Sequence, residues 1–309
     1  MIVADLAGGA LAERMAEGGL GIDFGAVRAR LRTDISVVAQ LIHGLYGRHP
    51  VLDVAGFFDV TAVLRRVRGV RRLLRPQIEF VVDGKPLFQP FPADTHLPLL
   101  EWGLNFLFAE RSGYYLMLHA GAVEFNGRAI LLPALPGSGK STLTAALSLS
   151  ACRLLSDEFG VIRLADGAVL PLLKLVGLKN ESIDVIAGRF PDATIGPRFP
   201  QTRKGTVAHL APPADAVAAI HESAQPTLIV FPRFRRHAAL RIERVPRSRA
   251  LGRLAVNSFN AELLGPDGFS ALGRLVQSCD CFEVSYGDLE HGVEAVKQLA
   301  ADAAVRIPQ

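Results

Sequence analysis

The chain has little cysteine, little tryptophan and no long apolar run. Three cysteines and one tryptophan among 309 residues exclude a disulfide scaffold and fit a reducing compartment. Cys279 and Cys281 have no histidine or second cysteine pair at the spacing of a zinc site. There is no run of 18 apolar residues, and no basic segment leads into an apolar core near the start. The sequence therefore predicts a cytoplasmic protein without a membrane span or signal peptide.

Charge of one sign is not in large excess either. The 34 lysines and arginines exceed the 30 acidic residues by only +4, which gives little reason to expect a nucleic-acid partner. Six arginines do fall within residues 65–75, but Gly69 interrupts any helical stripe there. We expect a solvated face or a docking patch for an acidic partner.

The composition, 50% hydrophobic and 21% charged, is that of a globular protein with about two domains. Residues 1–112 predict a smaller α+β domain, a scaffold or substrate-docking unit, and residues 113–309 a second domain. The apolar spacing predicts a strand over residues 22–31, an amphipathic helix over residues 34–46 and a helix over residues 99–108. Residues 77–82 lead into an Asp-Gly turn, the signal of a hairpin. The residues expected on the buried face of the first helix are Val37, Val38, Leu41, Ile42 and Leu45.

The most informative stretch is a strand, a glycine-containing loop and a helix over residues 127–158. Residues 129–132 predict a short buried strand, and residues 142–150 have helical spacing. The end of the loop between this strand and this helix matches the end of the P-loop sequence pattern. Ala134 stands where the full pattern has glycine. Loop amides and the Lys140 ammonium would bind the phosphates of ATP, and the Ser141 hydroxyl would meet Mg²⁺. The predicted nucleotide-binding residues are Pro136, Gly137, Ser138, Gly139, Lys140, Ser141 and Thr142.

Two carboxylates follow this helix. Residues 153–158 predict a short strand that ends in Asp157 and Glu158, and Asp157 comes 15 positions after Thr142. One helix followed directly by one strand brings these acids beside the loop. There one can hold Mg²⁺ and the other can orient or deprotonate an attacking hydroxyl.

Three segments resemble the catalytic domain of bacterial HPr kinase/phosphorylase in order and spacing. They are the P-loop, His119-Ala120-Gly121-Ala122-Val123 and the strand end Ser156-Asp157-Glu158. This resemblance implies an α/β P-loop kinase domain of the HPr kinase, PEP carboxykinase-like type. It makes Asp157 the base on a substrate hydroxyl, Glu158 a metal or phosphate-site acid and His119 a catalytic neighbour. The family has a second Asp where this chain has Glu158.

A closer resemblance, over nearly the whole chain, is to the branch named HprK-related kinase A. Its gene clusters also encode a PqqD-like peptide-binding protein, which suggests a protein or peptide substrate. HPr kinases assemble into hexamers, so the resemblance also implies a possible homo-oligomer. The blocks that carry it are residues 100–105, the P-loop, residues 156–158, 178–183 and 204–210, and Asn257-Ser258-Phe259-Asn260.

Two further lysines are candidates for the site. Lys179 is assigned a phosphate or substrate contact. Lys204 lies in a Pro- and Gly-rich stretch, residues 195–213, which predicts a mobile loop able to close on the γ-phosphate and exclude water. Trp102 is expected in the core.

The remaining C-terminal pattern is simpler. Residues 226–232 predict a buried strand bounded by prolines, followed by a solvated arginine loop, and the tail from residue 246 predicts helices. We treat four histidines as structural or surface residues: His209, His221, His237 and His291.

The sequence thus predicts an ATP- and Mg²⁺-dependent kinase that phosphorylates a serine or threonine hydroxyl of a protein or peptide. Lys140, Asp157, His119 and Lys204 are its catalytic candidates, and Ser141, Asp157 and Glu158 its metal ligands. Two alternatives stay open: a non-catalytic ATP-binding regulatory or scaffold protein, and a small-molecule kinase.

Overall fold

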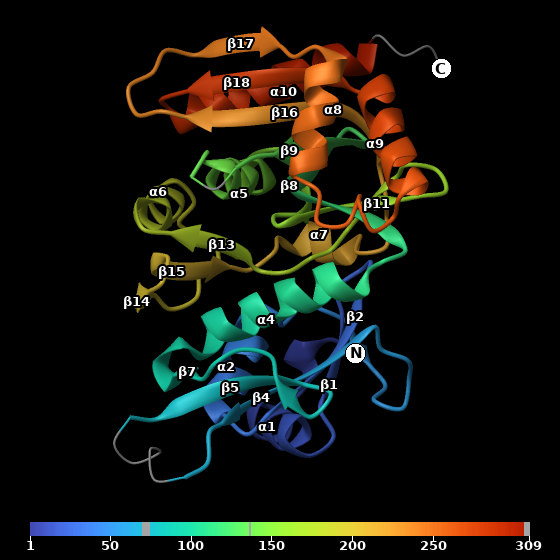
Figure 1. Cartoon of the computed structure of the whole chain (residues 1–309). Coiled ribbons are helices and arrows are strands. Elements are labelled where there is room, and N and C mark those ends of the chain that lie inside the picture. Colours follow the sequence, from blue (N-terminus) through green and yellow to red (C-terminus); the bar gives the residue numbers. More distant parts are fainter. Residues whose placement is uncertain (70–74, 136, 306–309) are drawn as a thin grey trace.

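The computed structural model describes residues 1–69, 75–135 and 137–305, and shows two sheets stacked along the long direction of the molecule with a helix between them (Figure 1). The predicted α/β class is confirmed, because the two large sheets both mix parallel and antiparallel strands.

The first sheet comes entirely from the N-terminal third of the chain. Its strands are β1 (Leu20–Asp23), β2 (Arg28–Thr33), β3 (Val51–Leu52), β4 (Val60–Arg66), β5 (Gln77–Val82), β6 (Lys85–Pro86) and β7 (Phe91–Pro92). They run in the order β3-β1-β2-β4-β5-β6, with β7 also on β5. Helices α1 (Gly8–Glu17) and α2 (Ser36–Leu45) lie against this sheet.

The second sheet is built after residue 114. Its strands are β8 (Tyr115–Phe125), β9 (Arg128–Pro133), β10 (Arg153–Ser156), β11 (Phe159–Arg163), β12 (Val169–Leu170), β16 (Gln225–Phe234), β17 (Arg241–Arg244) and β18 (Asp280–Tyr286). Their order is β12-β11-β8-β9-β16-β18-β17, with β10 on β8. Strands β9, β16 and β18 are parallel, so their carboxyl ends point to one edge of the sheet.

Helices cover both faces of the second sheet. They are α5 (Lys140–Ser150), α6 (Glu181–Arg189), α7 (Ala214–Ala218), α8 (Arg247–Val256), α9 (Pro266–Ser278) and α10 (Leu289–Val305). Apolar side chains of alternate strand positions pack with α5 and α10 on one face and with α8 and α9 on the other. A small antiparallel sheet lies beside α6: β13 (Val176–Lys179), β15 (Gly205–Leu210) and β14 (Phe199–Thr202).

Helix α4 (His96–Arg111) lies between the two large sheets (Figure 1). Its Leu104 and Phe108 are fully buried in an apolar cluster that also contains Met117 and Phe159 of the second sheet. Because this core continues across residue 112, the two halves share a packed interface. The predicted helix over residues 99–108 is real but extends further at both ends.

Two predicted elements are wrong. Residues 22–31 are not one strand but the hairpin β1-β2, because Asp23 Oδ1 accepts the Gly25 amide (2.9 Å) in an Asx turn. The tail is not wholly helical, because β18 lies inside the sheet between β16 and β17. Glu283 interrupts the apolar pattern of β18, and Arg233 and Arg253 compensate the charge of its carboxylate.

Three side chains or loops also differ from expectation. Val37 points outward on α2, and its side chain is 40% exposed. The predicted loop around Lys204 is the tight turn of the β14-β15 hairpin, which Thr202 Oγ1 closes by donating to Gly205 O (2.6 Å). Arg233 is not in a solvated loop but in β16, paired with Glu283 at 2.9 Å.

The arginine-rich segment lies only partly within the described residues. Arg65, Arg66, Arg68 and Arg75 are exposed, and Arg65 pairs with Glu79 at 2.6 Å. Among the described helices, none is both long and apolar enough to cross a bilayer.

Candidate functional site

The predicted P-loop sequence lies between β9 and α5, so the predicted order of strand, loop and helix is confirmed. Gly139 has φ +86°, in the left-handed region that favours glycine, and the next residue begins the helix. The Phe234 amide of β16 donates to Ser138 O (2.9 Å), so the loop is held against the neighbouring strand. Amides at the start of α5 form the positive end of that helix, which suits an anion. Pro136 lies outside the described residues.

Close packing brings α5 onto β8. A Cβ at Gly121 would lie 2.2 Å from Thr144 Oγ1, so only glycine allows this approach. The Thr144 hydroxyl itself donates to Lys140 O (2.9 Å). Gly121 therefore sets the depth at which α5 lies against the sheet.

Lys140 and Asp157 meet in the interior. Both are buried, and Lys140 Nζ donates to the backbone oxygen of Asp157 and lies 3.8 Å from Asp157 Oδ1. Asp157 Oδ1 has no hydrogen-bond partner among the described residues. A buried carboxylate oxygen without a donor is costly for folding alone, and is suited to accept a proton or to ligate a cation.

His119 and Glu158 form a second pair beside the first. His119 Nδ1 lies 3.5 Å from Glu158 Oε1, and the imidazole packs edge-on against Phe259. Burial and the nearby Lys140 charge lower the pKa of His119, so the neutral imidazole prevails at pH 7.

Burial alone would raise the pKa of Glu158, but the charges of Lys140, Lys174 and Lys179, and of His119 when it is protonated, outweigh it. The pKa of Glu158 is therefore held below its ordinary value, and this carboxylate is ionised at neutral pH.

One cleft collects most of the predicted site. It is lined by Ser141, Asp157, Glu158, Lys179 and Lys204, together with residues of α4 such as Trp102. The structure therefore brings five predicted residues together from four separate elements, with Lys140 buried directly behind them.

The two distal lysines differ in their surroundings. Lys179 is exposed at the end of β13, where its amide donates to Ser182 Oγ (2.7 Å). Lys204 Nζ lies 5.0 Å from the Trp102 ring centre, a cation–π contact across the two halves of the chain. Burial and the Lys179 charge lower the pKa of Lys204. Trp102 is thus half-buried in the cleft wall rather than in the core.

Three further residues of this cleft were not predicted as site residues: Lys174, Glu101 and Asn105. Lys174 is buried, with Nζ 3.0 Å from Glu101 Oε2 and hydrogen-bonded to Asn105 Oδ1. Tyr46 donates to Glu101 Oε1 (2.7 Å). A signal was present: Glu101 and Asn105 are four residues apart and share one face of α4. His209 also reaches the cleft, and burial lowers its pKa to about 4.

Other predicted residues lie around the loop rather than in the cleft. Gly137 and Gly139 shape it with positive φ, Thr142 is half-buried in the first turn of α5, and Ser138 lines a different pocket on the other flank. The P-loop residues therefore border two separate cavities.

The residues present fit Mg²⁺ only together with phosphate oxygens. Within the described ranges, no group of three or more His, Cys, Asp or Glu side chains would hold a metal by itself. Ser141 and the two carboxylates supply hard oxygen ligands, and Asp157 Oδ1, 3.8 Å from Lys140 Nζ, accepts no hydrogen bond from the described residues. Mg²⁺ in nucleotide sites is held in this way, by one or two carboxylates plus substrate phosphates and water.

Comparison with known proteins adds no relative. The chain matches neither a protein-family model nor a curated protein sequence. The chemistry of the site itself is therefore the basis for its function.

Proposed function

We propose that this protein is an ATP- and Mg²⁺-dependent kinase that transfers the γ-phosphate to a hydroxyl group of a protein or peptide. The observation that carries this proposal is the buried pair of Lys140, at the start of the loop helix, and Asp157, whose Oδ1 accepts no hydrogen bond from the described residues.

Each residue has a definite task in the proposed reaction. The amides at the start of α5 and the Lys140 ammonium bind the triphosphate, and Ser141, Asp157 and Glu158 are the ligands for Mg²⁺. Mg²⁺ held by these residues would neutralise charge on the phosphate oxygens. Asp157 accepts the proton of the acceptor hydroxyl as its oxygen bonds to the γ-phosphorus and the bond to the leaving ADP breaks.

The cations at the rim of the cleft support phosphoryl transfer. Lys179 and Lys204 both line the same cleft as Ser141 and Asp157. Positive charge there stabilises the equatorial oxygens of a loose transition state. The neutral His119 orients Glu158 without adding a competing charge beside Lys140.

The resemblance to HPr kinases supports both the P-loop kinase type of fold and a serine or threonine acceptor. The resemblance to the HprK-related kinase A branch also suggests a PqqD-like peptide-binding protein as the partner to test first. The N-terminal domain, whose α4 supplies Trp102 and Glu101 to the cleft wall, is the candidate docking unit for that substrate.

Transfer of label from γ-³²P ATP to a cell lysate tests this function, with wild type and Asp157→Asn side by side. We expect a labelled protein or peptide with wild type and none with the variant, while both bind ATP. Label in a small molecule would instead indicate a metabolite kinase. ATP binding without any transfer by wild type would overturn the kinase proposal in favour of a regulatory protein.

A further inference from the structure

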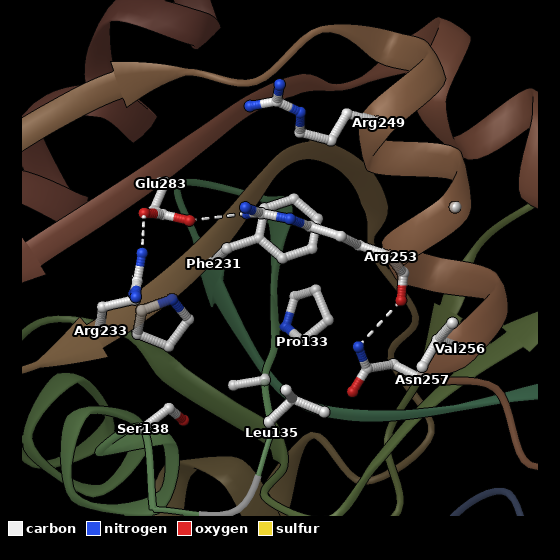
Figure 2. Close-up of a pocket in the computed structure, with 13 residues that line it drawn as sticks. Pro133, Leu135, Ser138, Phe231, Arg233, Arg249, Arg253, Val256, Asn257 and Glu283 are labelled. Atoms are coloured by element: carbon white, nitrogen blue, oxygen red, sulfur yellow. Dashed lines mark hydrogen bonds and ion pairs between the residues drawn. The ribbon is translucent and has the colours of Figure 1, made fainter.

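A second, larger cavity adjoins the P-loop on the flank away from the acids. Its volume is about 680 Å³, within the range of small-molecule sites. Leu135 and Ser138 of the loop form its lower edge, and α8 forms the opposite wall (Figure 2). This cavity is therefore continuous with the loop that would bind phosphates.

Sheet topology places this cavity where α/β sheets bind ligands. It lies toward the carboxyl ends of the parallel strands β9 and β16, and Glu283 of the parallel strand β18 reaches it from farther along the sheet. Crevices outside the carboxyl ends of parallel strands are the usual ligand sites of such sheets. The acids Asp157 and Glu158 lie on the opposite side of β9, beyond β8. A ligand along the loop would thus have one end at each cavity.

The walls combine apolar surface with excess positive charge. Pro133, Leu135 and Val256 are apolar, and Arg253 lies 4.9 Å over the Phe231 ring. Such a wall accommodates a flat ring, by stacking and by apolar contact.

Polar groups in the same cavity can fix the orientation of a ligand. Glu283 is held between Arg233 (2.9 Å) and Arg253 (2.8 Å), and Arg249 extends from α8 into the cavity rim (Figure 2). The buried Ser138 Oγ has no hydrogen-bond partner among the described residues. One carboxylate against three guanidinium groups leaves net positive charge, which suits a ligand that carries phosphate.

We propose that this cavity binds the nucleoside part of the nucleotide, base and ribose, with the phosphates running along the loop toward Asp157. This inference rests on the proposed function, and it assigns the nucleoside to Phe231, Arg253, Glu283 and the loop residue Ser138. The carboxylate of Glu283 is the acceptor for ribose hydroxyls or base amino groups.

Filling the cavity tests the inference. Gly252 is exposed on α8 and lines the cavity, and a Cβ there meets no atom within 4 Å. We therefore choose Gly252→Phe, with Gly273→Phe on α9 as the matched control, since a Cβ there is also unobstructed. Calorimetry with Mg²⁺ measures the affinity of each protein for ATP and for inorganic tripolyphosphate.

For wild type and Gly273→Phe we expect ATP to bind at least tenfold more tightly than tripolyphosphate. For Gly252→Phe this preference should vanish, while the affinity for tripolyphosphate stays within twofold. If Gly252→Phe does not fold, Val256→Trp replaces it, because Val256 is 78% exposed at the cavity rim.

Three results separate the inference from the proposed function. The nucleoside assignment is overturned if wild type binds tripolyphosphate in a Lys140-dependent manner but shows no preference for ATP. It is also overturned if Gly252→Phe keeps the preference for ATP. In both cases the P-loop proposal stands. If wild type binds neither compound, the proposed function fails and the inference fails with it.

Discussion

Two buried lysines of this molecule, Lys140 and Lys174, have the same exposure and opposite surroundings. Each is 7% exposed and faces a buried carboxylate. Lys174 hydrogen-bonds to the backbone and side chain of α4, and Tyr46 satisfies the second oxygen of its partner Glu101. Lys140 lies 3.8 Å from Asp157 Oδ1, which no donor satisfies among the described residues.

The difference separates a structural ion pair from one that suits a ligand. A buried charge pair is compatible with stability only when its remaining donors and acceptors are satisfied. The pair of Lys174 meets this condition and ties α4 to the wall of the cleft. The pair of Lys140 does not, and proteins retain such costly groups mainly where function needs them.

Asp157→Asn is expected to have the largest effect on catalysis. Loss of a general base typically lowers kcat by about 10² to 10⁴-fold, and we expect about 10³-fold here. The melting temperature should change little, because Asp157 Oδ1 already lacks a hydrogen-bond donor and Lys140 Nζ keeps its bond to the backbone oxygen of residue 157. Steady-state kinetics and calorimetry measure both. A large loss of stability with normal kcat would make Asp157 a structural residue.

Lys174→Met should produce the opposite pattern. Removing one partner of a buried pair typically destabilises a protein by about 3–5 kcal/mol. We expect a loss of that order in urea unfolding, while ATP affinity at low temperature stays near that of wild type. Adding Glu101→Gln should recover part of the loss, since no unpaired carboxylate remains buried. A fully stable Lys174→Met variant would remove the contrast between the two lysines.

Lys204→Met sharpens the comparison at the rim of the cleft. We expect kcat to fall about tenfold with little change in ATP affinity, because this cation acts on the transition state. Arg203→Met is the matched control: it is in the same turn and stacks on Phe91 at 5.3 Å, outside the cleft. Equal losses from both variants would indicate that the hairpin only needs its stacking contacts.

The smallest expected effect is the dependence on pH. The pKa of His119 is lowered from 6.5, so the unfolded chain takes up this proton first on acidification. Its contribution to stability is therefore present above pH 6.5 and is lost as the pH falls toward the lower folded-state pKa.

Glu158 acts in the same sense. Its lowered pKa stabilises the folded state above the carboxyl range, and this stabilisation is lost on stronger acidification. Unfolding measured from pH 8 to pH 5 should thus be less acid-sensitive for His119→Gln. Identical profiles for both proteins would exclude His119 as a titrating group.

Much of the site followed from local sequence pattern. The strand, loop and helix around Lys140 and the strand end at Asp157 are contiguous in the chain, so spacing alone placed them. The contribution of α4 was not predictable in this way, because Trp102 reaches Lys204 only after the two halves pack. Trp102 therefore looked like a core residue when judged by type.

The missed strand β18 has a similar explanation. A glutamate at its centre, Glu283, is typical of a surface residue. Inside the sheet its carboxylate is compensated by ion pairs with the arginines of β16 and α8. The turn after Asp23 was missed because residues on both sides of it are buried, which gave the appearance of one long strand.

Binding of ATP with Mg²⁺ by Lys140→Met and Lys174→Met tests the central contrast most directly, at a temperature where both variants are folded. We predict that Lys140→Met loses about 100-fold or more in affinity, as expected for loss of a charged contact to phosphate, and that Lys174→Met binds within threefold of wild type. Normal binding by Lys140→Met would contradict the assignment of this loop to nucleotide phosphates.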